Sequence, residues 1–424
     1  MFLQIHTLTS YHATLLNRDD AGLAKRIPFG DKTRLRISSQ CLKRHWRENL
    51  QDILPLPFGL RTRHFFQREV CQRLIKEKGL TQEQATRLTQ TLIGLLLQKS
   101  DKPKTDKPKR GTRAKTGSGG LALSLELDEA SAPEEAETVG LQVKQPILFG
   151  KPEADFLVSI LAECAREGAG AEKALETRLK TDKANFKAML RQAGHGNLYA
   201  GVEGALFGRF VTSDILARSD AAVHVAHAFT VHGLDTEVDY FTVVDDLNRD
   251  EETGAAHAGD MELGAGVYYG YVSVDLPLLV SNFTGSDPKD WRSQDSTEVR
   301  QVLSALVRAI ATVSPGAKLG ATAPFAYSDF VLLEAGTQQP RCLANAFLKA
   351  LQPRDNLSAQ AVTALAHHLS ALETMYGKTA EYRALATTCE WVGAPAPQPL
   401  DTATIEILNS VFDEDKHGHP AAAL

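Results

Sequence analysis

The chain has few cysteines and no apolar run long enough to cross a membrane. Its five cysteines are scattered, with no CxxC pair among them. Such a set is typical of a reducing cytosol and offers no four-ligand zinc cluster. No uncharged apolar stretch approaches about 18 residues, and the N-terminal MFLQIHTLTSY lacks the basic and apolar segments of a secretory signal. We therefore expect a cytoplasmic protein that does not use a membrane as a partner.

Motifs of common catalytic sites are also missing. The sequence contains no serine-hydrolase, phosphate-loop or dinucleotide-binding fingerprint. Six residues suggest a metallohydrolase cluster, but their spacing matches no defined ligand motif: His224, His227, His232, Asp245, Asp246 and His257. The segment VHVAHAFTVH is more simply interpreted as a strand with partly buried histidines. We predict no catalytic residue, no metal and no cofactor.

One short segment carries a strong positive charge, although the whole chain has a net charge of −5. Between residues 25 and 47, eight basic residues stand against a single acidic one, Asp31. An excess of this kind indicates either a solvated charged surface or a binding site for a polyanion. The positions of these charges along the predicted elements decide between the two interpretations.

These charges follow the periods of a strand and of a helix. Lys32, Arg34 and Arg36 alternate along a short predicted strand, so their side chains should project together. Ser38 or Ser39 should then cap a helix that reaches about Leu50, whose free N–H groups favour an anion. The helix carries Lys43, Arg44 and Arg47 in its first turns, and Ser38 and Gln40 are neutral donors. The pattern favours a path for successive phosphates, while an exposed amphipathic helix beside a charged strand remains the alternative.

The order of predicted elements indicates an α+β fold. Residues 2–10 alternate like a half-buried strand, 61–100 and 154–192 are patterned as helices, and strands dominate from Val223. The segment 101–140, with its DKPK tandem and acidic stretch, has the composition of a flexible surface insertion. DYFTVV (239–244) and VYYGYVSV (267–274) are predicted to pair as a hairpin with an unusually long connection.

Several motifs follow one another along the chain: LNRDD (16–20), FGDKTRLRISSQCLKR (29–44), GLRTR (59–63), ALFGR (205–209), AAVHVAHAFTVH (221–232), DYFTVVDDLN (239–248), GAAHAG (254–259), GVYYGYVSVD (266–275), SPGAK (314–318) and LANAF (343–347). In this order they resemble a known family, the CasC-type backbone subunit of the type I-E CRISPR Cascade complex. The resemblance covers about residues 1–350 and thins out beyond them.

The resemblance implies a hand-like fold. Residues 1–60 and 200–345 would form an RRM-like (ferredoxin-like) palm with an antiparallel sheet, and 61–199 a helical fingers domain that contains the 101–140 insertion. Residues 244–264 would be a β-hairpin thumb, and 346–424 a C-terminal helical extension. About six copies would polymerise head-to-tail along one CRISPR guide RNA, together with other Cascade subunits, and target DNA would pair with the guide.

The resemblance also implies specific RNA contacts. The RNA backbone would be held by Arg18, Lys32, Ser38, Gln40, Lys43, Arg44, Arg47 and Lys318, and Arg209 and Phe210 would support a kink in the RNA. Phe210 departs from the methionine of relatives and could stack on a base. Ala258 is smaller than the apolar wedge expected nearby.

Two other functions are compatible with the sequence. A metal-dependent ribonuclease of a related complex would use loop aspartates, for which Asp245, Asp246 and Asp250 are the candidates. A stand-alone RRM-like protein is less favoured, because the first strand offers Gln4 and His6 where such sheets carry stacking aromatics. We predict the non-catalytic RNA-binding subunit.

Overall fold

The chain forms two units, each with its own core. The computed structural model describes residues 1–97, 141–143, 146–181, 198–209, 219–243, 257–317, 319–352, 356–391 and 393–413. The first unit comprises Met1–Pro55 with Ala222–Leu424, and the second comprises Leu56–Ala221. The chain thus passes between the units near residues 55 and 221, whereas the sequence suggested boundaries at 60 and 200. The predicted 101–140 insertion lies outside the described residues.

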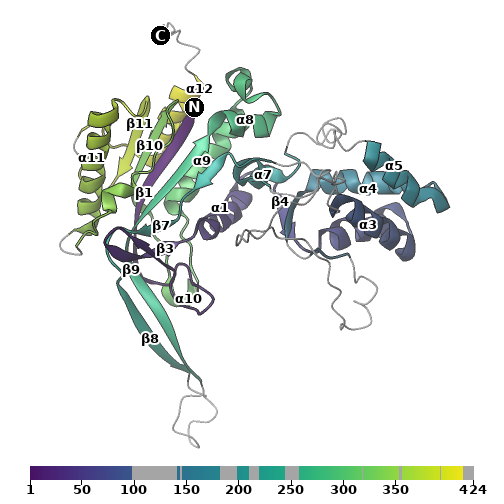
Figure 1. Ribbon diagram of the computed structural model, residues 1–424, viewed down its shortest axis with the longest axis horizontal. Coiled ribbons are helices and arrows are strands. Elements are labelled where there is room, and N and C mark those ends of the chain that lie inside the picture. The colour runs from purple at the N-terminus through teal and green to yellow at the C-terminus, as the bar shows by residue number, and fades with distance from the viewer. Residues whose placement is uncertain are drawn as a thin grey trace, which may run out of the picture. The chain divides into compact units, whose positions relative to one another are not determined.

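The first unit is built on an antiparallel sheet (Figure 1). Its strands are β1 (Phe2–Thr14), β2 (Arg26–Phe29), β3 (Lys32–Ile37), β6 (Val223–Val225), β7 (Ala228–Thr230), β8 (Thr236–Val243), β9 (His257–Asp275), β10 (Ser328–Gly336) and β11 (Tyr382–Thr387). The order across the sheet is β11-β10-β1-β9-β7-β3-β2, and β6 and β8 also pair with β9.

The centre of this sheet has ferredoxin-like topology. Helix α1 (Ser39–Ile53) follows β1, and α9 (Thr297–Thr312) stands between β9 and β10. Taken along the chain, β1, β6 with β7, β9 and β10 are the four ferredoxin strands, and they lie in the spatial order fourth, first, third, second. This confirms the predicted RRM-like α+β fold.

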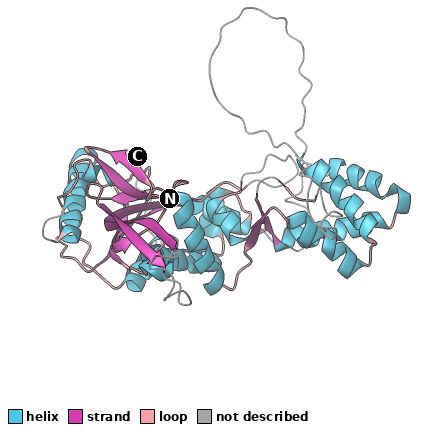
Figure 2. Cartoon of the chain, turned by 90° about the horizontal axis from the view of Figure 1, so that it is seen from below, coloured by secondary structure: helices cyan, strands magenta, loops and turns pink. Residues whose placement is uncertain are grey.

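Helices cover both faces of the sheet, as Figures 1 and 2 show. Leu42 and Trp46 of α1 pack with Ile310 of α9 on the face that carries Ile5. The opposite face packs against α11 (Leu357–Tyr376) and the short helical turn η5 (Ala344–Phe347). Strand β1 is therefore buried on both sides, including Gln4 and His6. The prediction of a half-buried first strand is wrong, because α11 comes from a distant part of the sequence.

The residues after 346 extend the sheet as well as adding helices. β11 pairs with β10, from Phe330 opposite Thr387 to Ala335 opposite Tyr382. The C-terminal segment is thus part of the first unit and is not purely helical. The remaining helices and turns of this unit are α8 (Leu276–Thr284), η4 (Pro288–Ser293), α10 (Leu319–Thr322) and α12 (Leu400–Phe412).

A two-stranded arm extends from the sheet (Figure 1). We use "arm" for β8 together with residues 257–264 of β9, which pair from Thr236 opposite Gly264 to Val243 opposite His257. The predicted pairing of DYFTVV with VYYGYVSV is wrong, because the latter segment of β9 pairs with β1, β6 and β7. β9 leaves the arm at Gly264, where a Cβ would lie 2.4 Å from Leu35 Cδ1, so a larger residue would require the Leu35 side chain to shift.

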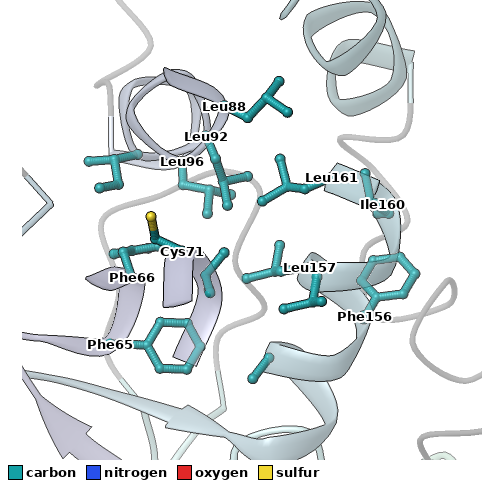
Figure 3. Packing of buried hydrophobic residues seen from close by; sticks show 14 of the residues in the cluster. Phe65, Phe66, Cys71, Leu88, Leu92, Leu96, Phe156, Leu157, Ile160 and Leu161 are labelled. Carbon is teal, nitrogen blue, oxygen red and sulfur yellow. The ribbon is translucent and has the colours of Figure 1, made fainter. Parts of the chain in front are cut away.

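The second unit is mainly helical in its described part (Figure 2). Its elements are β4 (Gly59–Thr62), the π-helical turn η1 (Phe66–Cys71), α2 (Gln72–Lys78), α3 (Gln82–Leu97), β5 (Ile147–Gly150), α4 (Lys151–Ala165), the 3-10 turn η3 (Gly168–Gly170), α5 (Ala171–Thr181) and α7 (Gly201–Phe207). Figure 3 shows its core, in which Leu88 and Leu92 of α3 face Leu157 and Leu161 of α4. All residues of this core belong to the second unit.

Candidate nucleic-acid interface

The basic segment runs from β3 directly into the N-terminus of α1. Ser38 has extended backbone angles, and its side chain accepts a hydrogen bond of 3.3 Å from the Cys41 N–H. The Ser38 N–H donates to Asn17 Oδ1 at 2.9 Å, so the LNRDD loop is fastened to the start of the helix. Ser38 is only 6% exposed. The hydroxyl that the sequence suggested as a donor to RNA thus already serves as the N-cap of α1.

The basic residues of α1 lie on the side of the helix that the core does not use. Leu42, Trp46 and Leu50 form the buried stripe at every fourth position. Lys43 and Arg47 are partly exposed and stand one turn apart, while Arg44 is exposed and pairs with Glu48 over 2.9 Å. A surface pair of this kind contributes little to stability, so Arg44 can exchange Glu48 for another anion at low cost.

Three further predicted residues of the first unit are exposed. Arg18 follows the loop that Asn17 anchors, Gln40 lies in the first turn of α1, and Lys32 begins β3. Residues from the loop, the strand and the helix therefore offer cationic or neutral donors in the same unit. Such a set can hold a chain of phosphates without reading its bases.

Arg34 does not belong to this exposed set. Its side chain is completely buried, because η5 and the end of β7 cover it. The guanidinium donates to the carbonyl of Thr230 at 3.1 Å and to that of Phe347 at 2.8 Å. The prediction that Lys32, Arg34 and Arg36 form one accessible row is therefore wrong for Arg34, which crosslinks the sheet to η5.

Arg36 lies next to a histidine that the sequence reasoning interpreted as an ordinary strand residue. Its Nη1 is 3.1 Å from His227 Nδ1, and its Nε donates to the Arg26 carbonyl at 3.2 Å. His227 is exposed. Partial desolvation lowers the pKa of the His227 imidazole, and the positive charges of Arg36 and Lys25 lower it further. Lys25 and His227 were missed because only the pairing of distant strands brings them together.

Arg209 is a core residue of the second unit. It is 3% exposed, and its Nη1 lies 2.6 Å from Glu153 Oε2 and 3.2 Å from the Leu148 carbonyl. A guanidinium enclosed in this way cannot touch RNA directly, so the prediction of a direct kink-supporting contact is corrected to a structural role. Phe210 lies outside the described residues, as does Lys318.

The structure describes the arm to Val243 on β8 and from His257 on β9. Val238 and Tyr240, two residues apart on β8, are 63% and 65% exposed. At the base of the arm, buried Glu262 accepts a 2.7 Å hydrogen bond from the Ala24 N–H and pairs with Arg26. The ribonuclease candidates Asp245, Asp246 and Asp250 lie outside the described residues, as does most of the predicted thumb from 244 to 256.

The histidines of the suggested metal cluster do not converge in the part of the chain that the structure describes. His224 and His227 are exposed, whereas His232 is buried with its Nδ1 2.8 Å from the Gly233 carbonyl. Among the described residues, no three histidine, cysteine or carboxylate side chains are grouped so that they could hold a metal ion. None of the described helices combines the length and the apolar composition that a membrane span requires.

Comparison with known proteins agrees with this architecture. Two solved structures each contain a chain that aligns over its whole length with 97% of this chain. One is described as "CRISPR RNA-guided surveillance complex, pre-nicking" (TM-score 0.72, 24% identity) and the other as "CRISPR RNA-guided surveillance complex" (TM-score 0.62, 21% identity). At these identities the likeness shows a shared fold. No curated protein matches the chain. The model of the CT1975-like protein family matches residues 3–411, and the chain therefore belongs to that family.

Proposed function

We propose that this chain is a non-catalytic backbone subunit of a type I-E CRISPR surveillance complex (Cascade). It binds CRISPR guide RNA, polymerises head-to-tail along it and presents it for pairing with target DNA. The observation that carries the proposal is the start of α1, where Lys43, Arg44 and Arg47 stand outside the core. This basic start occurs within a fold that is shared over nearly the whole chain with chains of RNA-guided surveillance complexes.

The proposed contacts are to the RNA backbone. Phosphates and shape are what a protein reads when sequence specificity is delegated to base pairing. The residues proposed to hold the backbone are Arg18, Lys32, Arg36, Gln40, Lys43, Arg44 and Arg47, with Ser38 as the cap that positions the helix start. Arg34 and Arg209 are left out because both are buried in ion pairs and backbone contacts.

A stand-alone RRM mode is disfavoured by the covered sheet. An RRM reads bases on the open face of its sheet, through aromatic side chains. Here Phe229 and Tyr269 of that face are buried against Phe347 and Leu365 of η5 and α11. The aromatic residues of this face are therefore used for packing. The RNA contacts are instead proposed on the basic residues near α1 and on the arm.

The arm supports the polymerising part of the proposal. Val238 and Tyr240 are largely exposed to solvent on this two-stranded element, which projects from the sheet (Figure 1). A neighbouring copy on the same guide RNA would supply a surface that covers them.

The test is co-purification. The full chain is expressed with its partner subunits and a CRISPR array, and the RNA that elutes with it is sequenced. Recovery of short guides, with a nuclease-protected length that scales with the number of protein copies, is the expected result. Recovery of no guide RNA would refute the proposal. Cleavage of a target RNA that stops in EDTA and in Asp246→Ala would instead establish the ribonuclease.

A further inference from the structure

A cluster of three basic side chains lies beside the start of α1 but on different segments of the chain. We call Lys25, Arg36 and His227 the cationic cluster. Arg36 comes from β3, Lys25 from the loop before β2, and His227 from the connection between β6 and β7. Both charged groups that act on His227 are positive. The connection that carries His227 lies beside β9, because the Ala226 N–H donates to the Tyr271 carbonyl at 3.0 Å, while the Tyr271 hydroxyl donates to Gln4 Oε1 at 2.9 Å.

The backbone at His227 interrupts the regular pairing with β9. Val225 is opposite Val272 and Phe229 is opposite Tyr269. Three residues of one strand therefore face two of β9, which is a β-bulge with His227 at its middle. Bulges re-aim single side chains, and they are frequent beside functional sites. His227 lies beside Arg36, which is opposite Phe229 in the pairing of β3 with β7.

The cationic cluster is continuous with the start of α1. Burial raises the pKa of the Cys41 thiol in the first turn of α1, while the charges of Lys25 and Arg44 act to lower it. Lys25 therefore lies within electrostatic reach of both Cys41 and His227. A chain of phosphates bound at α1 has a cationic path that leads past Lys25 to Arg36 and His227.

The hydrogen bond between Arg36 and His227 fixes the state of the imidazole when no anion is present. A guanidinium has only donors, so Arg36 must donate and His227 Nδ1 must accept. The imidazole is then neutral, with its proton on Nε2. A phosphate oxygen at this place would accept the Arg36 N–H instead. Nδ1 would then be free to take a proton from solvent and donate to the same anion.

We propose that Lys25, Arg36 and His227 bind one phosphate of the RNA backbone, and that His227 becomes protonated as this phosphate binds. The inference rests on the proposed function and adds to it a site and a regulation. Binding takes up one proton from solvent, no covalent bond changes, and the imidazolium offsets part of the phosphate charge. RNA affinity is therefore coupled to pH through a single side chain.

The experiment measures RNA binding by fluorescence anisotropy between pH 5.5 and 8.0 at constant ionic strength. It uses the full chain and a guide-length RNA with a 5′-hydroxyl, because a terminal phosphate titrates near pH ~6. Wild-type affinity should rise as the pH falls, by up to about tenfold per pH unit between the pKa of the free imidazole and that of the bound one. His227→Gln should abolish this slope, and His227→Lys should bind with no slope and with at least wild-type affinity at pH 7.5.

The matched control is His224→Gln, an exposed histidine three residues earlier on β6. It should keep the full wild-type slope. Hydrogen–deuterium exchange of histidine C2–H, read by mass spectrometry on the wild-type chain, gives a second measurement that needs no variant. The pKa of His227 should rise when RNA is added. An equal slope in wild type and His227→Gln, or an unchanged pKa of His227, would overturn the inference alone. Absence of RNA binding at any pH would overturn the proposed function with it.

Discussion

Replacing Lys43 and Arg47 with alanine tests the basic face of α1 most directly. Both side chains lie outside the buried stripe of Leu42, Trp46 and Leu50, so the double variant should fold normally. If each residue neutralises one phosphate, the variant loses two of the ion pairs that give RNA binding its salt dependence. The slope of log K against log salt should then be shallower by about 1.4 for a single-stranded RNA.

The difference in slope predicts a difference in how much affinity each protein loses between two salt concentrations. Between 50 and 200 mM salt, wild-type affinity should fall about sevenfold more than the affinity of the double variant. Fluorescence anisotropy titrations at several salt concentrations measure this for the full chain. Guides of unrelated sequence should be weakened equally, because phosphate contacts carry no base information.

The matched control removes two positive charges elsewhere. Lys76→Ala with Lys78→Ala changes two exposed residues near the end of α2 in the second unit. It has the same effect on net charge, so it corrects for the general electrostatic attraction between protein and RNA. Identical salt slopes in wild type and the Lys43/Arg47 variant would refute the basic-helix site, whatever the control shows.

Three further substitutions separate structural residues from binding residues. Arg209→Ala leaves the buried carboxylate of Glu153 unpaired and should destabilise the second unit by about 3–5 kcal/mol in urea unfolding, with a smaller loss when Glu153→Ala is added. Arg34→Met leaves two buried carbonyls without a donor and should lower the free energy of unfolding by about 2–6 kcal/mol, while the folded protein keeps wild-type RNA affinity. Burial alone would raise the pKa of Glu334, but hydrogen bonds and charges from His6 and neighbouring arginines hold it well below its usual value. Its carboxylate therefore stabilises the fold above about pH 4.5, and this stabilisation is lost as the pH falls toward the folded pKa; the stability gap between wild type and Glu334→Gln should be smaller at pH 3 than at pH 7.

The parts of the fold that depend on local sequence were predictable. The strand and helix on either side of Ser38 follow from alternation, a good N-cap and an apolar stripe, all within about 20 residues. The helix predicted at 297–313 is α9, whose apolar stripe includes Val299, Val302 and Leu306. The order of elements predicted only an α+β fold, whereas the ferredoxin-like palm was implied by the family resemblance.

Features that depend on distant segments were not predictable from local pattern. Arg34 has the same strand period as Arg36, yet η5, about 310 residues later, covers only the former. The pairing of β8 with 257–264 could not be distinguished by alternation from a pairing with 267–274, since both segments suit a strand. Nothing in the local sequence around Arg209 shows that it is buried. Its ion-pair partner Glu153 lies on α4, 56 positions earlier in the chain.

The segment Ala24–Arg26 connects the two surfaces that the proposed function needs. Glu262 at the base of the arm holds the Ala24 N–H and pairs with Arg26, and it is buried where it does so. The Arg26 carbonyl in turn accepts the Nε–H of Arg36, whose other nitrogen reaches His227. One continuous chain of hydrogen bonds thus fixes the arm and the cationic cluster to the same short stretch of backbone. These hydrogen bonds fix the base of the arm and the proposed phosphate site to the same segment, so their relative position is set together, which suits the proposed filament in which neighbouring copies share one RNA.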